Sequence, residues 1–537
     1  MNLLATFLTV SIIIGQIPCR DNYTIRIPNT VDIDETGTIE IQMIDNDLNE
    51  YQTLTISAPD NITINDSNGK DPLNMNILNN TITFIQNESG SKSIHYSIDN
   101  ISAGDWSGNL NLNISLSTNC PSNVLMNSSD IRQAIINSGC RSITFCDTYE
   151  GNNPIDISLA QDESILMYTP DRTNIIVTNN SNNKIIANED MSGLFLSTTR
   201  LKTINNIDKI DFSNCKNISR MFESSMLTTI NGLNNIDVSN VTDMSNLFKN
   251  NEQIVTIDLS NWNTAKVKNI SQMFYGCSSL TSLSISNFNT SNCEDMSYLF
   301  CNDRALTSVG DISNWNTANV TNMSHMFEYT YKLSALPDIS KWDVSNVEDF
   351  SYFLSNNKTL DYSVIENLNI SNKCKNISHF FDSKTFAKAS DYANLDLTNW
   401  DVSGVEDISY LFYFINHLDD INITGWNTAN VTNMSHMFDV GQDTLSKYLD
   451  NIYGIESLNV SSVTNMEYIF NSVYYLNKDL SNWDTRNLTN LNYAFYACSN
   501  MDLTALENWD VSSLIDKNET FSGGSGSLNN STLPSWY

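Results

Sequence analysis

Basic residues are scarce in this chain, which has 28 lysines and arginines against 61 aspartates and glutamates among its 537 residues. The formal net charge is −33, and no cluster of basic residues stands out from the acidic background. Contacts with the phosphates of nucleic acids or anionic membranes need clustered Lys and Arg, so the composition argues against both kinds of partner. An acidic surface would keep a secreted repeat protein soluble.

Long apolar runs are absent beyond the first 15 residues. The run Met1–Gly15 has the length of a signal peptide and is too short to span a bilayer comfortably. We expect residues 1–19 to form a signal peptide or an apolar leader, which predicts a secreted or cell-surface protein without any further bilayer-spanning segment. Lipidation at Cys19 is the minor alternative, because Ile17 and Pro18 are not the small residues that a lipobox requires.

Catalytic motifs are absent as well. The sequence has no Gly-x-Ser-x-Gly, no His-Glu-x-x-His, no phosphate-binding glycine loop and no Cys-x-x-Cys pair. We therefore expect no enzyme activity, no catalytic residue, no cofactor and no metal site.

What the chain does contain is one motif repeated twelve times between Ile210 and Phe521, with its clearest copy at Trp315–Phe327. Positions in each copy are numbered here from its closing residue, the anchor. The anchors recur every 25–27 residues, except for two intervals of 31 and 32 residues. This period predicts a solenoid, in which each unit is stable only by stacking on its neighbours. The anchors are Phe222, Phe248, Phe274, Phe300, Phe327, Leu354, Phe381, Phe412, Phe438, Phe470, Phe495 and Phe521.

Each copy has an alternating half and a helix-like half. Leu280–Ile285 alternates apolar with small polar residues, as a strand in a stacked sheet does. Apolar residues at positions −7, −4, −1 and 0 fit one helical face, and the Asn or Asp at every position −5 is a preferred helix N-cap. A row of Ca²⁺ ligands is the alternative for position −5, but only five of its twelve residues are Asp. The pattern predicts an α/β leucine-rich-repeat-like right-handed solenoid of about twelve 25–27-residue units, each a short strand plus a short helix or helical turn.

Two aromatic columns follow the repeat. Trp recurs at position −12, where Ile, Phe and Leu replace it, so we interpret this column as buried core rather than as a carbohydrate platform. Position −2 mixes Tyr and His with Arg, Asn and Gln, which indicates contact with water. It is either a stack between units or a partly exposed ribbon suited to a protein or glycan ligand. The residues that we assign to ligand binding are Tyr298, Tyr352, Tyr410, Tyr468 and Tyr493, beside a strand face with small polar residues such as Thr256 and Ser282.

The segments outside the repeats have their own patterns. Residues 20–117 contain six stretches that alternate with period two between Asn, Asp, Gly and Pro clusters, which predicts an Ig-like β-sandwich. Residues 118–205 are expected to be a transition and N-terminal cap, with a helix at Ser129–Asn137. The solenoid then spans residues 206–525 and a C-terminal tail spans 526–537. The expected strands of the cap are Ser142–Phe145, Ser164–Tyr168 and Asn174–Val177, and the expected insertions of the solenoid are Ser383–Ala393 and Val440–Gly454.

The ten cysteines predict no disulfide framework. Cys215, Cys293 and Cys374 lie at position −7, where other units carry Val, so we expect buried thiols that act as small apolar residues. Cys215 and Cys293 are three units apart, about 14 Å by the strand spacing, and a disulfide needs Cα atoms within about 7 Å. A single bridge among Cys120, Cys140 and Cys146 remains open.

The unit Trp-[ND]-[TV]-[SA]-x-Val-x-[ND]-Met-Ser-x-Met-Phe, followed by Cys-Ser-x-Leu-Thr-x-Leu, resembles the repeat of the BspA-like leucine-rich-repeat surface proteins and of Mycoplasma lipoproteins. Ile101–Ser115 is similar to the β domain that precedes such repeats in gut Firmicutes proteins. The resemblance implies a cell-surface or secreted binding protein, associated in some members with adhesion to host matrix proteins and to other cells. Ser531–Tyr537 departs from this pattern, because it begins a sortase-like Leu-Pro but lacks the Thr-Gly and the apolar tail.

Together these features favour an extracellular adhesion or ligand-binding module whose partner is a host matrix protein, a glycan or another cell. A secreted enzyme that uses the repeats as a targeting arm is a hypothesis of a different class. A glycosylated eukaryotic surface protein is a third, because the repeat generates sequons such as Asn319-Val-Thr and Asn433-Met-Ser.

Overall fold

The structure is a computed structural model of the chain. Contacts divide the chain into two compact units, each described by itself below: Met1–Met126 with Ile155–Leu166 and Asn179–Asn183, and Asn127–Pro154 with Met167–Thr178 and Lys184–Tyr537. The described residues are 7–14, 23–26, 30–32, 36–46, 52–66, 73–79, 81–84, 90–98, 106–118, 123–179, 184–357, 362–382, 394–415, 420–441, 451–473, 476, 478–498, 503–522 and 533–537.

The N-terminal unit consists of β-sheet. Its strands are β1 (Phe7–Ile14), β2 (Tyr23–Arg26), β3 (Thr30–Asp32), β4 (Thr36–Asn46), β5 (Gln52–Ser57), β6 (Asn61–Asp66), β7 (Leu73–Ile77), β8 (Thr81–Phe84), β9 (Gly90–Ile98) and β10 (Trp106–Thr118). They pair in the order β2-β4-β9-β7-β6-β10-β1-β3, and β5 pairs with both β10 and β8. The described ladders are antiparallel, except that β1 runs parallel to β10. The six stretches expected from their alternation lie in β2, β4, β5, β8, β9 and β10.

Alternation along these strands buries one face of the sheet. Ile39 and Ile41 in β4 are fully buried, whereas Thr38, Glu40 and Gln42 between and beside them are exposed. Side chains of a strand point alternately to opposite faces, so this pattern places one face on the core and one in water. The core also contains Leu54, Ile56, Met75, Ile94, Leu110 and Leu112.

The apolar N-terminal run takes part in this sheet. Phe7–Ile14, which we expected to belong to a leader, forms β1 in parallel register with β10, from Phe7 opposite Ser107 to Ile14 opposite Ile114. Within the part of the chain that the structure describes, no helix has the length and apolar character needed to cross a membrane.

The second unit begins with a capped helix and a small parallel sheet. Helix α1 (Ser128–Ser138) covers the expected Ser129–Asn137, and Asn127 Oδ1 caps it by accepting from Asp130 N at 3.0 Å. The N-cap is therefore Asn127, two residues before the expected start of the helix. Gly139 ends the helix in the left-handed conformation, with φ 65°. Its strands are β11 (Ser142–Cys146), β13 (Leu166–Tyr168, whose first residue falls in the N-terminal unit), β14 (Asn174–Thr178), β15 (Ile185–Ile186), β16 (Thr203–Asn205), β17 (Ile210–Asp211) and β18 (Thr229–Ile230), with β14-β11-β16-β18 parallel neighbours. β12 (Ile155–Asp156) belongs to the N-terminal unit.

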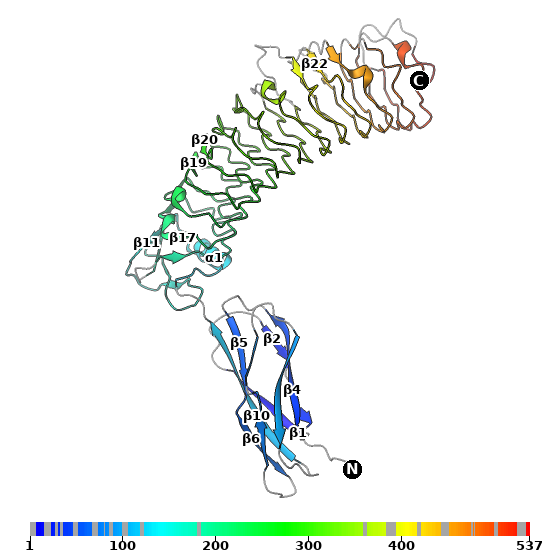
Figure 1. The fold of residues 1–537 in the computed structure, drawn as a ribbon. Coiled ribbons are helices and arrows are strands. Elements are labelled where there is room, and N and C mark those ends of the chain that lie inside the picture. Colours follow the sequence, from blue (N-terminus) through cyan, green and yellow to red (C-terminus); the bar gives the residue numbers. More distant parts are fainter. Residues whose placement is uncertain are drawn as a thin grey trace, which may run out of the picture. The chain divides into compact units, whose positions relative to one another are not determined.

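The repeats stack as successive coils, side by side in sequence order (Figure 1). Isolated parallel bridges join position −5 of each coil to the next, from Asp190 to Asn217 and on to Asp516. The short elements of the coils are β19 (Thr256–Asp258), β20 (Ser282–Ser284), β21 (Leu395–Asp396), β22 (Asp420–Asn422), β23 (Asn451–Tyr453) and the 3-10 turns η1 (Ile207–Lys209), η2 (Leu233–Asn235), η3 (Tyr362–Ile365), η4 (Ile455–Ser457) and η5 (Leu503–Leu506). β19 pairs with β20, and β21, β22 and β23 pair in order, all in parallel.

The helical half expected in each unit is wrong: among the described repeat residues this half is a run of β-turns. Glu223 N donates to Arg220 O at 3.0 Å, three residues back, whereas an α-helix would bond four residues back. Alternate amides leave the coil altogether, since Arg220 N donates to Ser245 O (2.9 Å) and Phe222 N to Leu247 O (2.9 Å) in the next one. Apolar residues at −7, −4, −1 and 0 thus face one core because consecutive turns share that spacing with a helix.

The Asn or Asp at position −5 accepts a backbone hydrogen bond, as expected, but closes an Asx turn rather than a helix end. Asn322 Oδ1 accepts from Ser324 N at 2.9 Å, and Asn217 Oδ1 from Ser219 N at the same distance. The same turn occurs one coil earlier, where Asp190 accepts from Ser192. The stack therefore starts within the segment that we expected to be only a cap.

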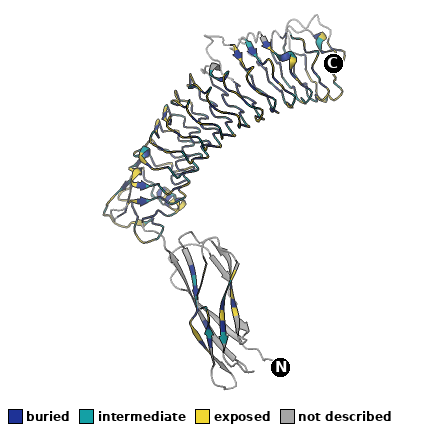
Figure 2. Ribbon diagram, in the orientation of Figure 1, coloured by how far each residue is buried: buried dark blue, intermediate teal, exposed yellow. Residues whose placement is uncertain are grey.

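Buried residues recur along the coils (Figure 2). Two aromatic columns fill the core of the coils. Phe rings at the anchors stack with centroids 5.1–5.9 Å apart, beginning with Phe195 against Phe222. The Trp column at position −12 is only 2–4% exposed, which confirms its assignment to the core. Trp262 Nε1 donates to Leu233 O of the preceding coil at 2.9 Å, so the polar edge of a buried indole is satisfied.

The long intervals do not shift the register. Phe381 stacks on Phe412 across the first of them, and Phe438 stacks on Phe470 across the second, both with ring centroids 5.7 Å apart. The expected insertions themselves, Ser383–Ala393 and most of Val440–Gly454, lie outside the described residues. Cys215, Cys293 and Cys374 are buried free thiols, as expected. Cys140 and Cys146 are also free, and Cys120 lies outside the described residues.

Candidate ligand-binding surface

Position −2 forms a continuous stack of rings on the turn side of the coils. Each ring stacks on the next with centroids 4.0–4.7 Å apart and planes within 8–13°. All five tyrosines that we assigned to ligand binding belong to it. We call this stack the aromatic row; its members are Tyr298, His325, Tyr352, His379, Tyr410, His436, Tyr468 and Tyr493.

The backbone under the row is in a conformation that large side chains rarely adopt. Every member has φ between 55° and 58°, in the left-handed region that favours Gly and Asn. Gly193 and Asn246 occupy the same position in earlier coils and suit it without penalty. Holding a bulky residue there costs about 1–3 kcal/mol, and each stacked pair returns about 0.5–1.5 kcal/mol. Tyr and His therefore occur here for the contacts of their rings, since the backbone alone would favour Gly or Asn.

The row is not part of the core. All eight members are intermediate in exposure, and the side chains of His325, His379 and His436 are 16–17% exposed, several times more than the Trp column. Neighbours cover both faces of each inner ring, so the part that reaches water is the ring edge. The edge of Tyr carries its hydroxyl, and the edge of His carries Nε2.

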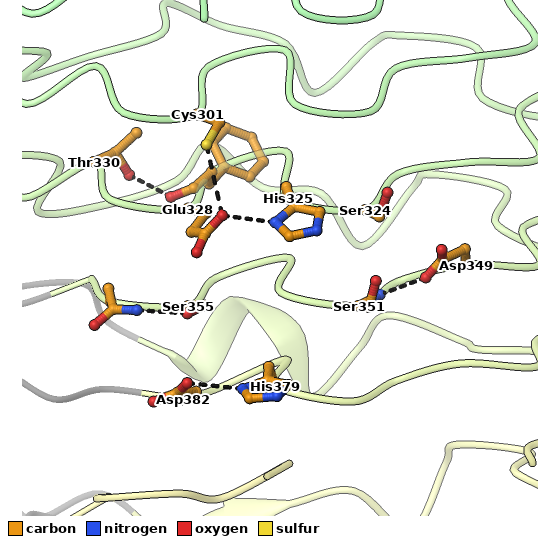
Figure 3. A network of polar contacts seen from close by, with 12 residues as sticks. Cys301, Ser324, His325, Glu328, Thr330, Asp349, Ser351, Ser355, His379 and Asp382 are labelled. Atoms are coloured by element: carbon orange, nitrogen blue, oxygen red, sulfur yellow. Dashed lines mark hydrogen bonds and ion pairs between the residues drawn. The ribbon is translucent and has the colours of Figure 1, made fainter. Parts of the chain in front are cut away.

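A buried carboxylate lies beneath each histidine, three residues further on. His325 Nδ1 is 2.6 Å from Glu328 Oε2, and His379 Nδ1 is 2.8 Å from Asp382 Oδ2 (Figure 3). His436 Nδ1 is likewise 2.6 Å from Asp439 Oδ2. The three acidic residues are 3–7% exposed. A carboxylate only accepts, so Nδ1 carries the hydrogen of this bond, and Nε2 is the ring nitrogen left for another partner. The pair also fixes the orientation of each imidazole.

The outward atoms of the row have no hydrogen bond within the described part of the chain. None of the five tyrosine hydroxyls and none of the three Nε2 atoms is hydrogen-bonded to another described residue. Partial burial, reinforced by the charges of Asp382 and Glu328, raises the pKa of Tyr352 to about 12. Partial burial also raises the pKa of Tyr298, Tyr410 and Tyr468. These phenols accordingly stay protonated at neutral pH and can donate.

One cysteine approaches the row without forming a nucleophile. Cys301 Sγ lies 3.6 Å from Glu328 Oε2, the oxygen that also bonds His325. The thiol is 3% exposed, and burial together with the charge of Glu328 raises its pKa. A catalytic cysteine needs a lowered pKa and an adjacent base, whereas here the carboxylate is bonded to both groups. Cys301 and Glu328 therefore position the imidazole of His325.

The strand face offers a second, smaller stripe. Thr256 and Asp258 are exposed in β19, and Ser282 and Ser284 are exposed at the paired positions of β20. Hydrogen bonds from Ser260 lower the pKa of Asp258, so this stripe carries negative charge. Within the described residues no group of three or more His, Cys, Asp or Glu side chains is arranged to hold a metal ion.

The sequence reasoning found the members of the row but missed the carboxylates beneath it. Their signal is present in the repeat, since an acidic residue follows each of the three histidines at the same distance, as in His325-Met-Phe-Glu328. It also missed the left-handed backbone, because no Gly or Asn marks that position in the aromatic coils.

Comparison with known proteins assigns the repeats to a described family. A family model described as Mycoplasma protein of unknown function, DUF285, matches residues 189–308, 277–392, 382–452 and 446–536. Together these segments span residues 189–536, which is more than half of the 537-residue chain. The first match begins at the coil of Asp190 and Phe195. No curated protein and no solved structure matches the chain.

Proposed function

We propose that this chain, which belongs to the DUF285 family of Mycoplasma proteins of unknown function, is a secreted or cell-surface adhesion protein whose aromatic row binds an extracellular protein or glycan. The observation that carries the proposal is the set of eight aligned ring edges, whose tyrosine hydroxyls and histidine Nε2 atoms have no hydrogen bond to another described residue. Unpaired polar groups on a half-buried surface form hydrogen bonds with whatever covers them.

The construction of the row supports binding. Stacking fixes the rings, and the buried carboxylates fix the imidazoles, so little side-chain freedom is lost when a ligand docks. Tyr also offers contact area at low entropic cost with a polar tip. Each left-handed Tyr or His carries a conformational cost that Gly or Asn would avoid, and a ligand-binding role gives a reason for that cost.

We also propose a more detailed architecture for the repeats and for the N-terminal strands. The motif and its spacing support a right-handed BspA-like leucine-rich-repeat solenoid of about twelve units, with turns in place of the helices that we expected. The N-terminal strands support an Ig-like sandwich that acts as a spacer. The apolar run at residues 1–19 supports export, and the acidic net charge of −33 supports a soluble extracellular surface.

The test is capture by the full chain of immobilised extracellular matrix proteins, glycans and host cells. The variant Tyr352→Ala/Tyr410→Ala/Tyr468→Ala is expected to lose at least tenfold in affinity for the captured ligand. The matched control is Tyr453→Ala, which removes a 45% exposed tyrosine outside the row. If both variants lose the same affinity, or if capture survives the triple substitution, the aromatic row is not the binding surface. The strand face would then be the remaining candidate.

A further inference from the structure

We infer that the aromatic row recognises an uncharged, hydroxyl-rich glycan through the edges of its rings; this inference rests on the proposed function and names its ligand class. Three properties of the row lead to it: its covered ring faces, its alternating hydrogen-bonding atoms, and its charge.

The ring faces are not available for stacking with a ligand. His379 lies between Tyr352 and Tyr410, with centroids 4.0 and 4.2 Å away and planes within 9°. The same holds for every inner member, since consecutive rings are never more than 4.7 Å apart. A ligand that needs a free aromatic face, such as a quaternary ammonium group or a stacked base, finds none along the row. Contact is limited to the ring edges and their polar atoms.

Those polar atoms alternate between two kinds from Tyr298 to Tyr468. Each tyrosine offers a hydroxyl, which can donate and accept, and each histidine offers Nε2, since its Nδ1 is bonded to a carboxylate. A ligand lying along the row therefore meets a hydroxyl at one ring and a ring nitrogen at the next, and it needs groups that can both donate and accept. A hydroxyl group does both, so a chain of hydroxyls satisfies every ring in either register.

The acidic residues beneath the row and the spacing of its rings disfavour anionic ligands and extended peptides. Arg220 is the one basic residue at position −2 and lies outside the row, whereas Glu328, Asp382 and Asp439 lie directly beneath it. Sulfates, phosphates and carboxylates can only accept, and they meet like charge here. An extended peptide presents its hydrogen-bonding groups on one edge every second residue, about 6.6 Å apart, and cannot match rings spaced 4.0–4.7 Å.

The experiment removes tyrosine hydroxyls from the row and keeps the aromatic rings. Full-length protein is titrated against uncharged glucan, mannan and galactan oligosaccharides, with heparin as the sulfated arm and immobilised matrix proteins as the polypeptide arm. The variant Tyr352→Phe/Tyr410→Phe keeps both stacks and loses two hydroxyls, and is expected to lower affinity for the bound neutral glycan by about tenfold. Tyr453→Phe, outside the row, is the matched control and should bind as the native chain does.

Each outcome decides a different point. Tighter binding of heparin than of any neutral glycan, or unchanged glycan affinity in the Tyr→Phe variant, overturns the inference. Capture of a matrix protein through the row with no glycan bound overturns it too, but leaves the proposed function standing. Failure of the native chain to bind in all three arms counts against the proposed function itself. If the native chain has twice its monomer mass in solution and the Tyr→Phe variant does not, the row is a contact between two copies of the chain. That result overturns the inference of glycan binding.

Discussion

Trp536 stacks on Trp509 with ring centroids 6.4 Å apart and planes within 5°, and its Nε1 donates to Leu506 O at 2.8 Å. Trp509 makes the same bond to Leu480 O of its own preceding coil, at 3.0 Å. Trp536 thus occupies the next position of the Trp column after Trp509. It covers the face of the Trp509 ring that points away from the preceding coil.

From this relationship we expect Trp536→Ala to destabilise the repeat region by about 1–3 kcal/mol, less than a fully buried Trp would, because Trp536 is half-buried. Denaturant unfolding should show the loss as a lower midpoint. Leu533→Ala, which truncates a 46% exposed side chain nearby, is the control and should change stability by less than 0.5 kcal/mol or so. If the two variants unfold alike, the indole does not close the core.

A second prediction concerns Asp303, which is fully buried and has no hydrogen bond to either side-chain oxygen among the described residues. Burial raises its pKa well above the usual 3.8. Asn251 occupies the equivalent place two coils earlier and donates from Nδ2 to Phe222 O and Phe248 O, at 2.5 and 3.0 Å. A carboxylate cannot donate in this way, so the charged form of Asp303 is penalised in the folded state.

Because the folded pKa of Asp303 lies above the unfolded one, the stability associated with its proton is complete below about pH 3.8 and is lost as pH rises through the folded value. Asp303→Asn removes the titration and adds a donor, so it should stabilise the protein at pH 7.5 by about 1–3 kcal/mol. The advantage should shrink when unfolding is measured near pH 4. A variant that is less stable than the native chain at pH 7.5 would contradict this assignment.

A third prediction tests the Asx turns. Asn322→Ala removes the oxygen that accepts from Ser324 N and should cost about 1 kcal/mol, by analogy with the loss of a helix cap. Asn322→Asp keeps an acceptor at the same place and should cost much less, since Asp349 holds the equivalent bond to Ser351 N at 2.8 Å. Thermal unfolding of the two variants side by side measures the difference. Equal costs would mean that the side-chain bond contributes nothing.

Much of the repeat region could be predicted from its period. The buried Trp column, the anchor phenylalanines and the tyrosines of position −2 all follow from residues that recur at one spacing, because stacked coils place equal positions beside one another. The coil of Phe195 escaped detection, since Asn188 stands at its position −7, where later coils carry Val, Cys or Leu.

The turns could not be predicted in the same way. Position −2 is left-handed in His325 and Tyr352 although neither residue favours that conformation, and the amide of Arg220 pairs with the next coil rather than with its own. Both features depend on contacts between residues about 26 positions apart, as in the bond from Arg220 N to Ser245 O. A local sequence pattern reports only the spacing of apolar residues, and that spacing is the same in a helix and in these turns.

The last prediction concerns the N-terminus, where two expectations meet. As a leader, residues 1–19 would be removed on export, whereas β1 (Phe7–Ile14) pairs along its whole length with β10 and also with β3. We expect export to remove it, because the run has signal-peptide length and the remaining strands still bury Ile39, Ile56 and Leu112 in one core. Expression of the full gene product in a secreting host, followed by mass analysis of the exported protein, should show a mass lower by about 19 residues. A shortened chain lacking residues 1–19 should then unfold at the same midpoint as the exported protein. Recovery of the intact N-terminus would instead assign β1 to the mature fold, and removing it should then lower the midpoint of the N-terminal unit alone.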